Sequence, residues 1–275
     1  MTTTRIRQIA LIGDDYDRIS DDISEVFGLA EAFRDPGHRP MHEGGVSGFG
    51  LRNVVWPIGD QFLELVAPAP GLPESAGRRY LDRRGGPGGY MVLFQVARSD
   101  YQPTLDRATA AGIRLAETEG IGDETSEAVH FHPKDLPGAI VEVRWCDNDD
   151  RPDGDWWPVE RDWREARRTD VVTGIAAVEI QTPTPAELAR TWAAVLDVAV
   201  GVDGGIHPCL RVAGTAIRFV QPTDGRPEGL GGLDLVCVDP ARARSTARRL
   251  GLPVRGDVIT VCGTRMRLVK PGSGS

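Results

Sequence analysis

The sequence predicts an α+β fold built from four repeated units, each with its elements in the order βαβββ. Two observations support this prediction. Apolar runs of strand length open the units at residues 5–13, 90–97, 175–182 and 233–239. Each run is followed at once by residues that start helices, so one pattern occurs four times along the 275-residue chain. Self-similarity of this kind indicates a repeated architecture.

The helix after each opening strand has a recognisable beginning and end. The predicted helices span residues 16–27, 104–111, 186–196 and 241–250. Their start signals are pairs of capping and first-turn residues, namely Asp14 with Asp15, Ser99 with Asp100, Thr184 with Pro185, and Asp239 with Pro240. Glycines at positions 28, 112 and 251 end three of the four helices.

Strand-like runs follow each helix, at residues 50–56 and 61–66, 129–132 and 139–145, 209–212 and 216–220, and 258–261 and 264–269. The chain therefore divides into a first domain (1–146), a linker (147–170), a second domain (171–270) and a tail (271–275). The linker holds Trp156, Trp157 and Trp163, which we expect to pack onto one of the domains. A Pro/Gly-rich stretch at 68–89 is expected to join the first two units.

Composition excludes several classes of protein. Hydrophobic residues make up 40% and charged residues 26%, which is ordinary for a globular chain. A formal net charge of −8 argues against nucleic acid as a partner. No apolar stretch is long enough for a membrane span, and no apolar leader precedes the first strand, so we expect a cytoplasmic protein. The four cysteines are scattered and predict neither a zinc site nor a disulfide framework.

The most specific motif is FHPKDLPGAIVEV at residues 131–143. It resembles an epimerase-like signature that ends in a metal-binding glutamate. With the repeated units, it makes the whole chain resemble a two-domain member of the vicinal oxygen chelate superfamily. That superfamily includes glyoxalase I, methylmalonyl-CoA epimerase, extradiol dioxygenases and bleomycin-resistance proteins. The resemblance implies four βαβββ modules paired into two glyoxalase-like domains.

The superfamily places its metal ligands at four equivalent strand positions of a domain. In the first half these hold Gln8, Glu64, Met91 and Glu142, and a histidine is usual where Met91 stands. The resemblance therefore implies Gln8, Glu64 and Glu142 as metal ligands. In the second half the positions hold Ala177, a residue near Arg218, Leu233 and Arg267. No oxygen or imidazole ligand is among these four, so we expect the second half to be degenerate.

Each candidate glutamate stands between two apolar neighbours, so strand alternation places it on the opposite face from them. That face is either solvent or a pocket, and both readings stay open at this point. Two carboxylates in one pocket would share a cation or a proton. Two apart on a strand, His130 and His132 either line the pocket as acid–base or positioning groups or play a structural part. A glycine-rich segment containing His42 is a candidate for the pocket mouth.

Two functions of different classes follow from the resemblance. The favoured one is an isomerase, epimerase or lyase that acts on a small carbonyl- or carboxyl-bearing metabolite through Glu142, Glu64, His132 and His130. Such chemistry moves a proton and stabilises an enolate. The pocket would carry out this chemistry either with one bound divalent ion (Mg²⁺, Mn²⁺, Ni²⁺ or Zn²⁺) or without a metal. The alternative is a metal-free protein that binds or sequesters a small molecule, as bleomycin-resistance proteins do; pairing into a homodimer is left open.

Overall fold

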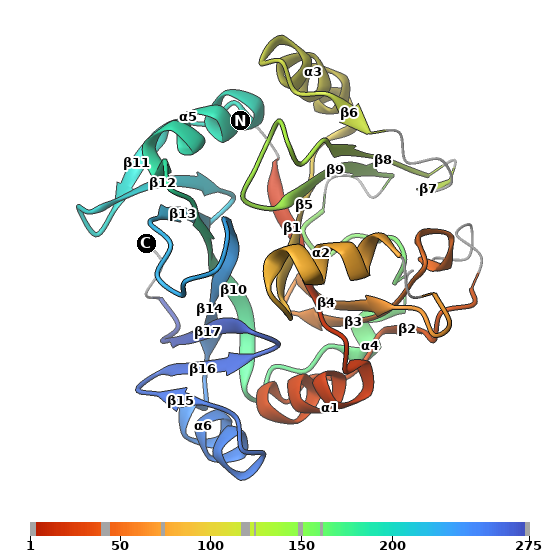
Figure 1. Cartoon of the computed structure of the whole chain (residues 1–275), viewed down its shortest axis with the longest axis vertical. Helices are drawn as coiled ribbons and strands as arrows, with labels where there is room; N and C mark the ends of the chain where they lie inside the picture. Colours follow the sequence, from red (N-terminus) through yellow and green to blue (C-terminus); the bar gives the residue numbers. More distant parts are fainter. Residues whose placement is uncertain are drawn as a thin grey trace.

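The computed structural model describes residues 4–39, 45–72, 75–116, 122–123, 125–147, 151–159 and 162–272. These residues form two large mixed sheets that lie side by side, with helices at both ends of the molecule (Figure 1). Both sheets are built from two successive strand–helix–strand units. The predicted α+β class with four repeated units is therefore confirmed. No helix in the described part of the chain is long and apolar enough to cross a membrane.

The first sheet has the strand order β2-β3-β4-β1-β5-β9-β8-β6, and β7 pairs with β8. Its elements are β1 (Arg5–Ile12), α1 (Tyr16–Phe27), β2 (Phe33–Asp35), the 3-10 helix η2 (Ser47–Phe49), β3 (Leu51–Ile58), β4 (Gln61–Pro68), α2 (Ala76–Arg84), β5 (Gly88–Gln95), α3 (Arg98–Ala110), β6 (Leu115–Ala116), β7 (Gly122–Asp123), β8 (Ser126–Phe131) and β9 (Ile140–Cys146).

The second sheet repeats this plan, with the order β11-β12-β13-β10-β14-β17-β16-β15. Helix α4 (Trp163–Ala166) precedes it, and its elements are β10 (Val172–Gln181), α5 (Pro185–Leu196), β11 (Val200–Asp203), β12 (His207–Val212), β13 (Thr215–Val220), β14 (Gly229–Cys237), α6 (Pro240–Arg249), β15 (Val254–Arg255), β16 (Val258–Val261) and β17 (Thr264–Val269).

In each sheet, an approximate twofold axis between the two central strands relates the two strand–helix–strand units. In the first sheet the antiparallel pair β1 and β5 sets Gln8 opposite Leu93 and Ala10 opposite Met91. Exchanging the two strands therefore exchanges Gln8 with Met91. A residue of one unit thus has an identifiable counterpart in the other, which gives a way to compare the four candidate ligand positions.

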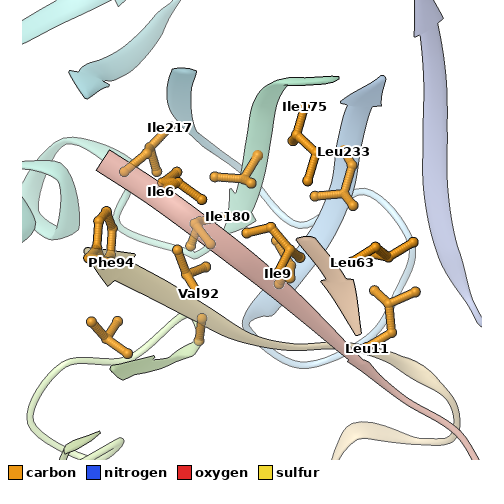
Figure 2. Packing of buried hydrophobic residues seen from close by; sticks show 14 of the residues in the cluster. Ile6, Ile9, Leu11, Leu63, Val92, Phe94, Ile175, Ile180, Ile217 and Leu233 are labelled. Atoms are coloured by element: carbon orange, nitrogen blue, oxygen red, sulfur yellow. The ribbon is translucent and has the colours of Figure 1, made fainter. Parts of the chain in front are cut away.

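One continuous apolar core joins the two sheets. Figure 2 shows Val92 of β5 lying close to Ile180, and Ile9 of β1 close to Leu233, both of the second sheet. Near Gly89, β5 comes so close to β14 that a Cβ on this glycine would lie 2.4 Å from Leu230 Cγ. Since each sheet uses one face for this contact, the opposite face of each is left to form a concave surface of its own.

The helices differ from the prediction in two places. Residues within 68–89 form α2, which the Pro/Gly content concealed; Ser75 caps it by accepting a hydrogen bond from the Arg78 amide at 3.2 Å. Helix α3 begins at Arg98 rather than Thr104, because it runs through Pro103 instead of starting after it. In α1 the predicted bounds are confirmed at both ends, with Gly28 in the left-handed conformation at its end.

The linker packs onto the first domain, as expected of its tryptophans. Trp156 and Trp163 are each 1% exposed and lie against Phe62 of β4, with ring centroids 6.5 and 5.0 Å away. The guanidinium of Arg7 in β1 lies 5.2, 5.8 and 5.7 Å from the ring centroids of Phe62, Trp156 and Trp163. Its Nη2 donates a hydrogen bond to the Gly154 carbonyl at 2.6 Å. This arrangement brings the linker against the concave face of the first sheet.

Candidate functional site

The concave face of the first sheet encloses a cavity of about 240 Å³. Its walls are mostly apolar, and they come from the region of η2, from strands β3, β4, β5 and β9, and from the linker. The apolar lining consists of Val46, Phe49, Leu51, Val66, Ala76, Tyr90, Met91, Leu93, Ile140, Trp157 and Pro158. The polar lining consists of Gln8, Asn53, Glu64, His130, Glu142 and Arg144. A pocket of this composition suits a small, largely apolar ligand that carries few polar groups.

Glu64 and Glu142 both face this one cavity and are 6% and 3% exposed. The alternative that strand alternation points them into solvent is therefore wrong. Their positions are equivalent under the approximate twofold, since Glu64 lies beside Ala10 of β1 and Glu142 beside Leu93 of β5. The sheet thus brings together the two glutamates that the sequence singled out.

The partners of Glu64 are two neutral amides. Its Oε1 accepts a hydrogen bond from Asn53 Nδ2 at 2.6 Å, and its Oε2 accepts one from Gln8 Nε2 at 2.8 Å. Burial raises the pKa of Glu64 to about 7, although both amide donors favour the ionised form and work against this rise. A carboxyl group with such a pKa can both take up and release a proton near neutrality.

The partners of Glu142 are cationic or can become so. Arg144 Nε donates to Glu142 Oε1 at 2.9 Å, and His130 Nε2 lies 2.9 Å from Glu142 Oε2. Burial alone would raise the pKa of Glu142, but the charge of Arg144 and the contact with His130 outweigh it and lower the pKa to about 2. Glu142 is therefore ionised throughout the physiological range.

Gln8 is held between Glu64 and the linker. Its Oε1 accepts a hydrogen bond from the Trp156 indole Nε1 at 2.7 Å, while its Nε2 faces Glu64. The carbonyl oxygen, which is the atom that would bind a cation, is thus already engaged. Met91, the counterpart of Gln8, lines the cavity with a thioether that is a weak ligand for hard ions.

The atoms at these positions do not fit a divalent cation as they are arranged. Every carboxylate oxygen of Glu64 and Glu142 has a nitrogen partner from the protein, and the positive charge in the cluster belongs to Arg144. Within the described ranges, no three His, Cys, Asp or Glu side chains gather in a group that could hold a metal ion. The ligand set implied by Gln8, Glu64 and Glu142 is replaced here by a network of hydrogen bonds.

Only one of the two sequence-predicted histidines reaches the cavity. His130 lines it, whereas β8 ends at Phe131, so His132 lies in the turn that follows. The His132 side chain is 3.2 Å from Arg114 Nη2 and 3.9 Å from Asp135, away from the glutamates. Of the two readings left open for these histidines, the position of His130 fits the pocket and that of His132 fits a structural part, so His132 does not stand where an acid–base group of the cavity would. His42 lies outside the described residues.

The second sheet carries no carboxylates at the equivalent positions. Arg218 and Arg267 stand where Glu64 and Glu142 stand in the first sheet, and Asp234 bridges them. Arg218 donates to both Asp234 oxygens, at 2.6 and 2.9 Å, and Arg267 Nε donates to Asp234 at 2.8 Å. An ion-pair network therefore occupies this concave face.

One of the predicted second-half positions needs correction. Leu233 is 1% exposed in the core between the sheets, and its neighbour Gly232 is the counterpart of Met91. A shift of one residue along a strand moves a side chain to the other face, and β14 begins at Gly229, four residues before the predicted start at Leu233. Ala177 does occupy the position predicted for it and is buried.

Three functional side chains were missed by the sequence reasoning. Arg144 stands two residues after Glu142 on the same strand, so alternation alone was a usable signal that it shares the cavity face. Asn53 lies on β3, for which only the apolar pattern was considered. Trp156 was recognised as part of the linker, but nothing in the sequence indicates its contact with Gln8, 148 positions earlier.

Comparisons with known proteins place the chain as follows. A family model described as glyoxalase-like domain matches residues 24–196. A hypothetical protein from Staphylococcus aureus has a similar structure, with a TM-score of 0.64, 9% identity and coverage of 97% of this chain and 99% of that one. A variant of 4-hydroxymandelate synthase from Streptomyces coelicolor is also similar, with a TM-score of 0.62, 16% identity and coverage of 92% and 76%. At these identities the likeness shows the fold alone.

A methylmalonyl-CoA epimerase variant from Streptomyces coelicolor matches more weakly, with a TM-score of 0.41, 21% identity and coverage of 52% of this chain and 96% of the epimerase. A search of curated proteins finds no match to the sequence. The chemistry must therefore be argued from the cavity itself.

Proposed function

The chain belongs to the glyoxalase-like family, and from this premise we propose that it is an enzyme of the isomerase, epimerase or lyase type. In this proposal Glu64 moves a proton next to the carbonyl group of a small, mainly apolar metabolite. Arg144 stabilises the enolate oxygen that forms. No metal takes part, because the atoms that would bind one are engaged with one another.

A single observation carries the proposal: two buried glutamates of one cavity have partners of different kinds. Glu64 faces only neutral amide donors, whereas Glu142 faces Arg144 and His130. Environments that separate two carboxyl groups in this way assign one as the group that exchanges protons and the other as a fixed charge. Glu64, with a pKa of about 7, is the proton-transfer group.

Arg144 is placed to act on the developing charge. Its Nε is bound to Glu142 and its Nη1 lies 3.5 Å from Ser126 Oγ, while its Nη2 makes no hydrogen bond to any side chain in the described ranges. The guanidinium lines the cavity and is 1% exposed, so water does not screen it. A buried, fixed cation of this kind stabilises an enolate more strongly than it would in solvent.

The charge balance of the cavity indicates the substrate class. Arg144 and Glu142 neutralise each other, and Glu64 must be ionised to take up a proton, so the reactive cavity carries a net negative charge. An uncharged carbonyl compound therefore fits the polar cluster better than a polyanion, for which no surplus cation lines the walls. Its apolar body would contact residues such as Leu51, Tyr90 and Ile140.

The test is hydrogen exchange at the carbon next to a carbonyl. A panel of small uncharged ketones and hydroxyketones is incubated with the protein in D₂O, and loss of the C–H signal is followed by NMR. Glu64→Gln should slow exchange by roughly 10²–10⁴-fold while retaining ligand binding in a thermal-shift assay. Glu127→Gln, an exposed glutamate of the same sheet, is the control and should leave the rate unchanged.

Undiminished exchange in the Glu64 variant would overturn the assignment of that residue. A panel compound that binds the wild-type protein tightly and exchanges no hydrogen would instead favour the sequestration function. The two results are distinguishable because binding and exchange are measured separately.

A further inference from the structure

Trp156 touches none of the carboxylates, yet it fixes how one of them is bound. Its indole Nε1 donates to Gln8 Oε1 at 2.7 Å, and Gln8 Nε2 donates to Glu64 Oε2 at 2.8 Å. We infer that Trp156 is a positioning residue, whose indole N–H holds the Gln8 amide with its NH₂ group turned toward Glu64.

The orientation of the Gln8 side chain follows from the chemistry of its amide and of the Trp156 indole. The two ends of a glutamine amide have nearly the same shape, so packing alone does not decide which end faces Glu64. An indole N–H can only donate a hydrogen bond. The end of Gln8 that faces Trp156 must therefore be the carbonyl oxygen, and the end that faces Glu64 must be the donor.

Two consequences for the cavity follow from this orientation. Glu64 receives a hydrogen bond that it could not receive if the amide were reversed, because two acceptor oxygens would then face each other whenever Glu64 is ionised. The Gln8 carbonyl is withdrawn from the cavity, so the residue that resembles a metal ligand acts as a hydrogen-bond donor. Both consequences depend on Trp156, which belongs to the linker and not to the sheet.

The linker is fastened firmly enough for such a role. Trp156 is 1% exposed and stacks on Phe62 with an interplanar angle of 9°. The Arg7 guanidinium lies 5.8 Å from the Trp156 ring and is hydrogen-bonded to the Gly154 carbonyl two residues earlier. The indole is thus held by an aromatic ring and by a cation that contacts both rings.

The chain offers a matched control in Trp163. It is also 1% exposed and also packs on Phe62, but its Nε1 is buried with no hydrogen-bond partner among the described residues. Trp156→Phe and Trp163→Phe remove similar packing from the same segment. Only the first of the two removes a hydrogen bond.

The measurement is NMR of the Gln8 side-chain NH₂ group and the Trp156 indole N–H in protein labelled with ¹⁵N at glutamine and tryptophan. The Gln8 signal is assigned by its loss in Gln8→Met. In the wild type, the two NH₂ protons should be widely separated, because only one of them is donated to a carboxyl group. Trp156→Phe should bring them toward the values of exposed glutamines, and Trp163→Phe should leave them in place.

Gln8→Met supplies a second test should Trp156→Phe fail to fold. This variant keeps the tryptophan and removes its acceptor, so the Trp156 indole proton should exchange with solvent about tenfold faster. The inference is overturned if the Gln8 signals survive Trp156→Phe, if Trp163→Phe changes them equally, or if Gln8→Met leaves the indole exchange rate unchanged. The part played by Trp156 in turnover rests on the proposed function, but these signals need no substrate, so either proposal can fail alone.

Discussion

Glu64 and Glu142 lie at equivalent positions of β4 and β9, and they are bound by partners of different charge. Amides of Asn53 and Gln8 surround the first, and the Arg144 guanidinium and His130 surround the second. A symmetric backbone therefore presents two carboxyl groups that differ in protonation at neutral pH.

Ionisation of Glu64 should make the fold less stable as the pH rises. Burial raises the pKa of Glu64 from 4.5 to about 7, so the folded state keeps a proton that the unfolded chain loses above 4.5. The resulting stability is complete below about pH 4.5 and is lost as the pH passes 7. The free energy of unfolding should fall by up to roughly 3 kcal/mol over that range.

Urea unfolding at about pH 5 and about pH 8 measures this dependence. Glu64→Gln carries no titrating group, so the variant should lack the decrease. Parallel pH profiles for the wild type and the variant would show that Glu64 does not have the raised pKa.

Removing Arg144 should destabilise the protein strongly. Arg144→Met leaves the Glu142 carboxylate buried without its cation, which typically costs about 3–5 kcal/mol. The double variant with Glu142→Gln should recover part of this loss, because the uncompensated charge is then absent. Chemical denaturation of the two single variants and the double variant measures the coupling, and strictly additive losses would contradict it.

The ion-pair network of the second sheet should support the fold but not the site. Burial would raise the pKa of Asp234, but Arg218 and Arg267 outweigh it and lower that pKa below 3.8. Asp234 therefore contributes stability above pH 3.8 that is lost on further acidification. Asp234→Asn should unfold at a higher pH than the wild type in acid titrations followed by circular dichroism. Ligand binding in the first-sheet cavity at neutral pH should be unchanged.

Gly89 should not tolerate a side chain. An alanine Cβ there would lie 2.4 Å from Leu230 Cγ, which forces the two sheets apart. Gly89→Ala should lower the free energy of unfolding by about 1–3 kcal/mol or more, as overpacked cores do. Gly201 of β11 is the control, since a Cβ at that position meets only the Cys209 carbonyl at 3.7 Å. Equal unfolding midpoints for the two variants would contradict the close approach.

Chelators should leave the protein unchanged. Because the oxygens of Glu64 and Glu142 are paired with protein nitrogens, we expect no divalent ion to contribute to stability. Dialysis against EDTA should shift the melting temperature by less than about 1 °C, and elemental analysis should find no stoichiometric metal. A large shift that is reversed by Mg²⁺, Mn²⁺, Ni²⁺ or Zn²⁺ would contradict the metal-free proposal.

The repeated pattern predicted the fold because the signals for each unit lie close together in the sequence. The strand before α1, its capping residues and Gly28 are all neighbours in the sequence, so the bounds of α1 could be read directly. Glu64 and Glu142 were found for a similar reason, since alternation and the repeat both act over short distances. Whether the two glutamates face the same cavity could not be predicted without the register of β1, β4, β5 and β9.

What escaped prediction depends on contacts between distant segments. The bond from Trp156 to Gln8 joins a linker to the first strand, and no local pattern encodes it. Leu233 was assigned to the wrong face because it was taken as the start of the strand, whereas β14 begins at Gly229 in a glycine-rich run that does not favour a strand. The sequence left two readings open for His132, and its contacts with Arg114 and Asp135, which lie outside β8, decide for the structural one.

The continuous core between the sheets also gives a structural role to the second half, which has arginines where the first half has Glu64 and Glu142. Ile9, Leu11 and Val92 are each 0% exposed and belong to the core that the two sheets share. Cut away at the linker, the first half would present this row of aliphatic side chains to water and to other copies of itself. The second half therefore acts as a permanent internal partner that shields this surface.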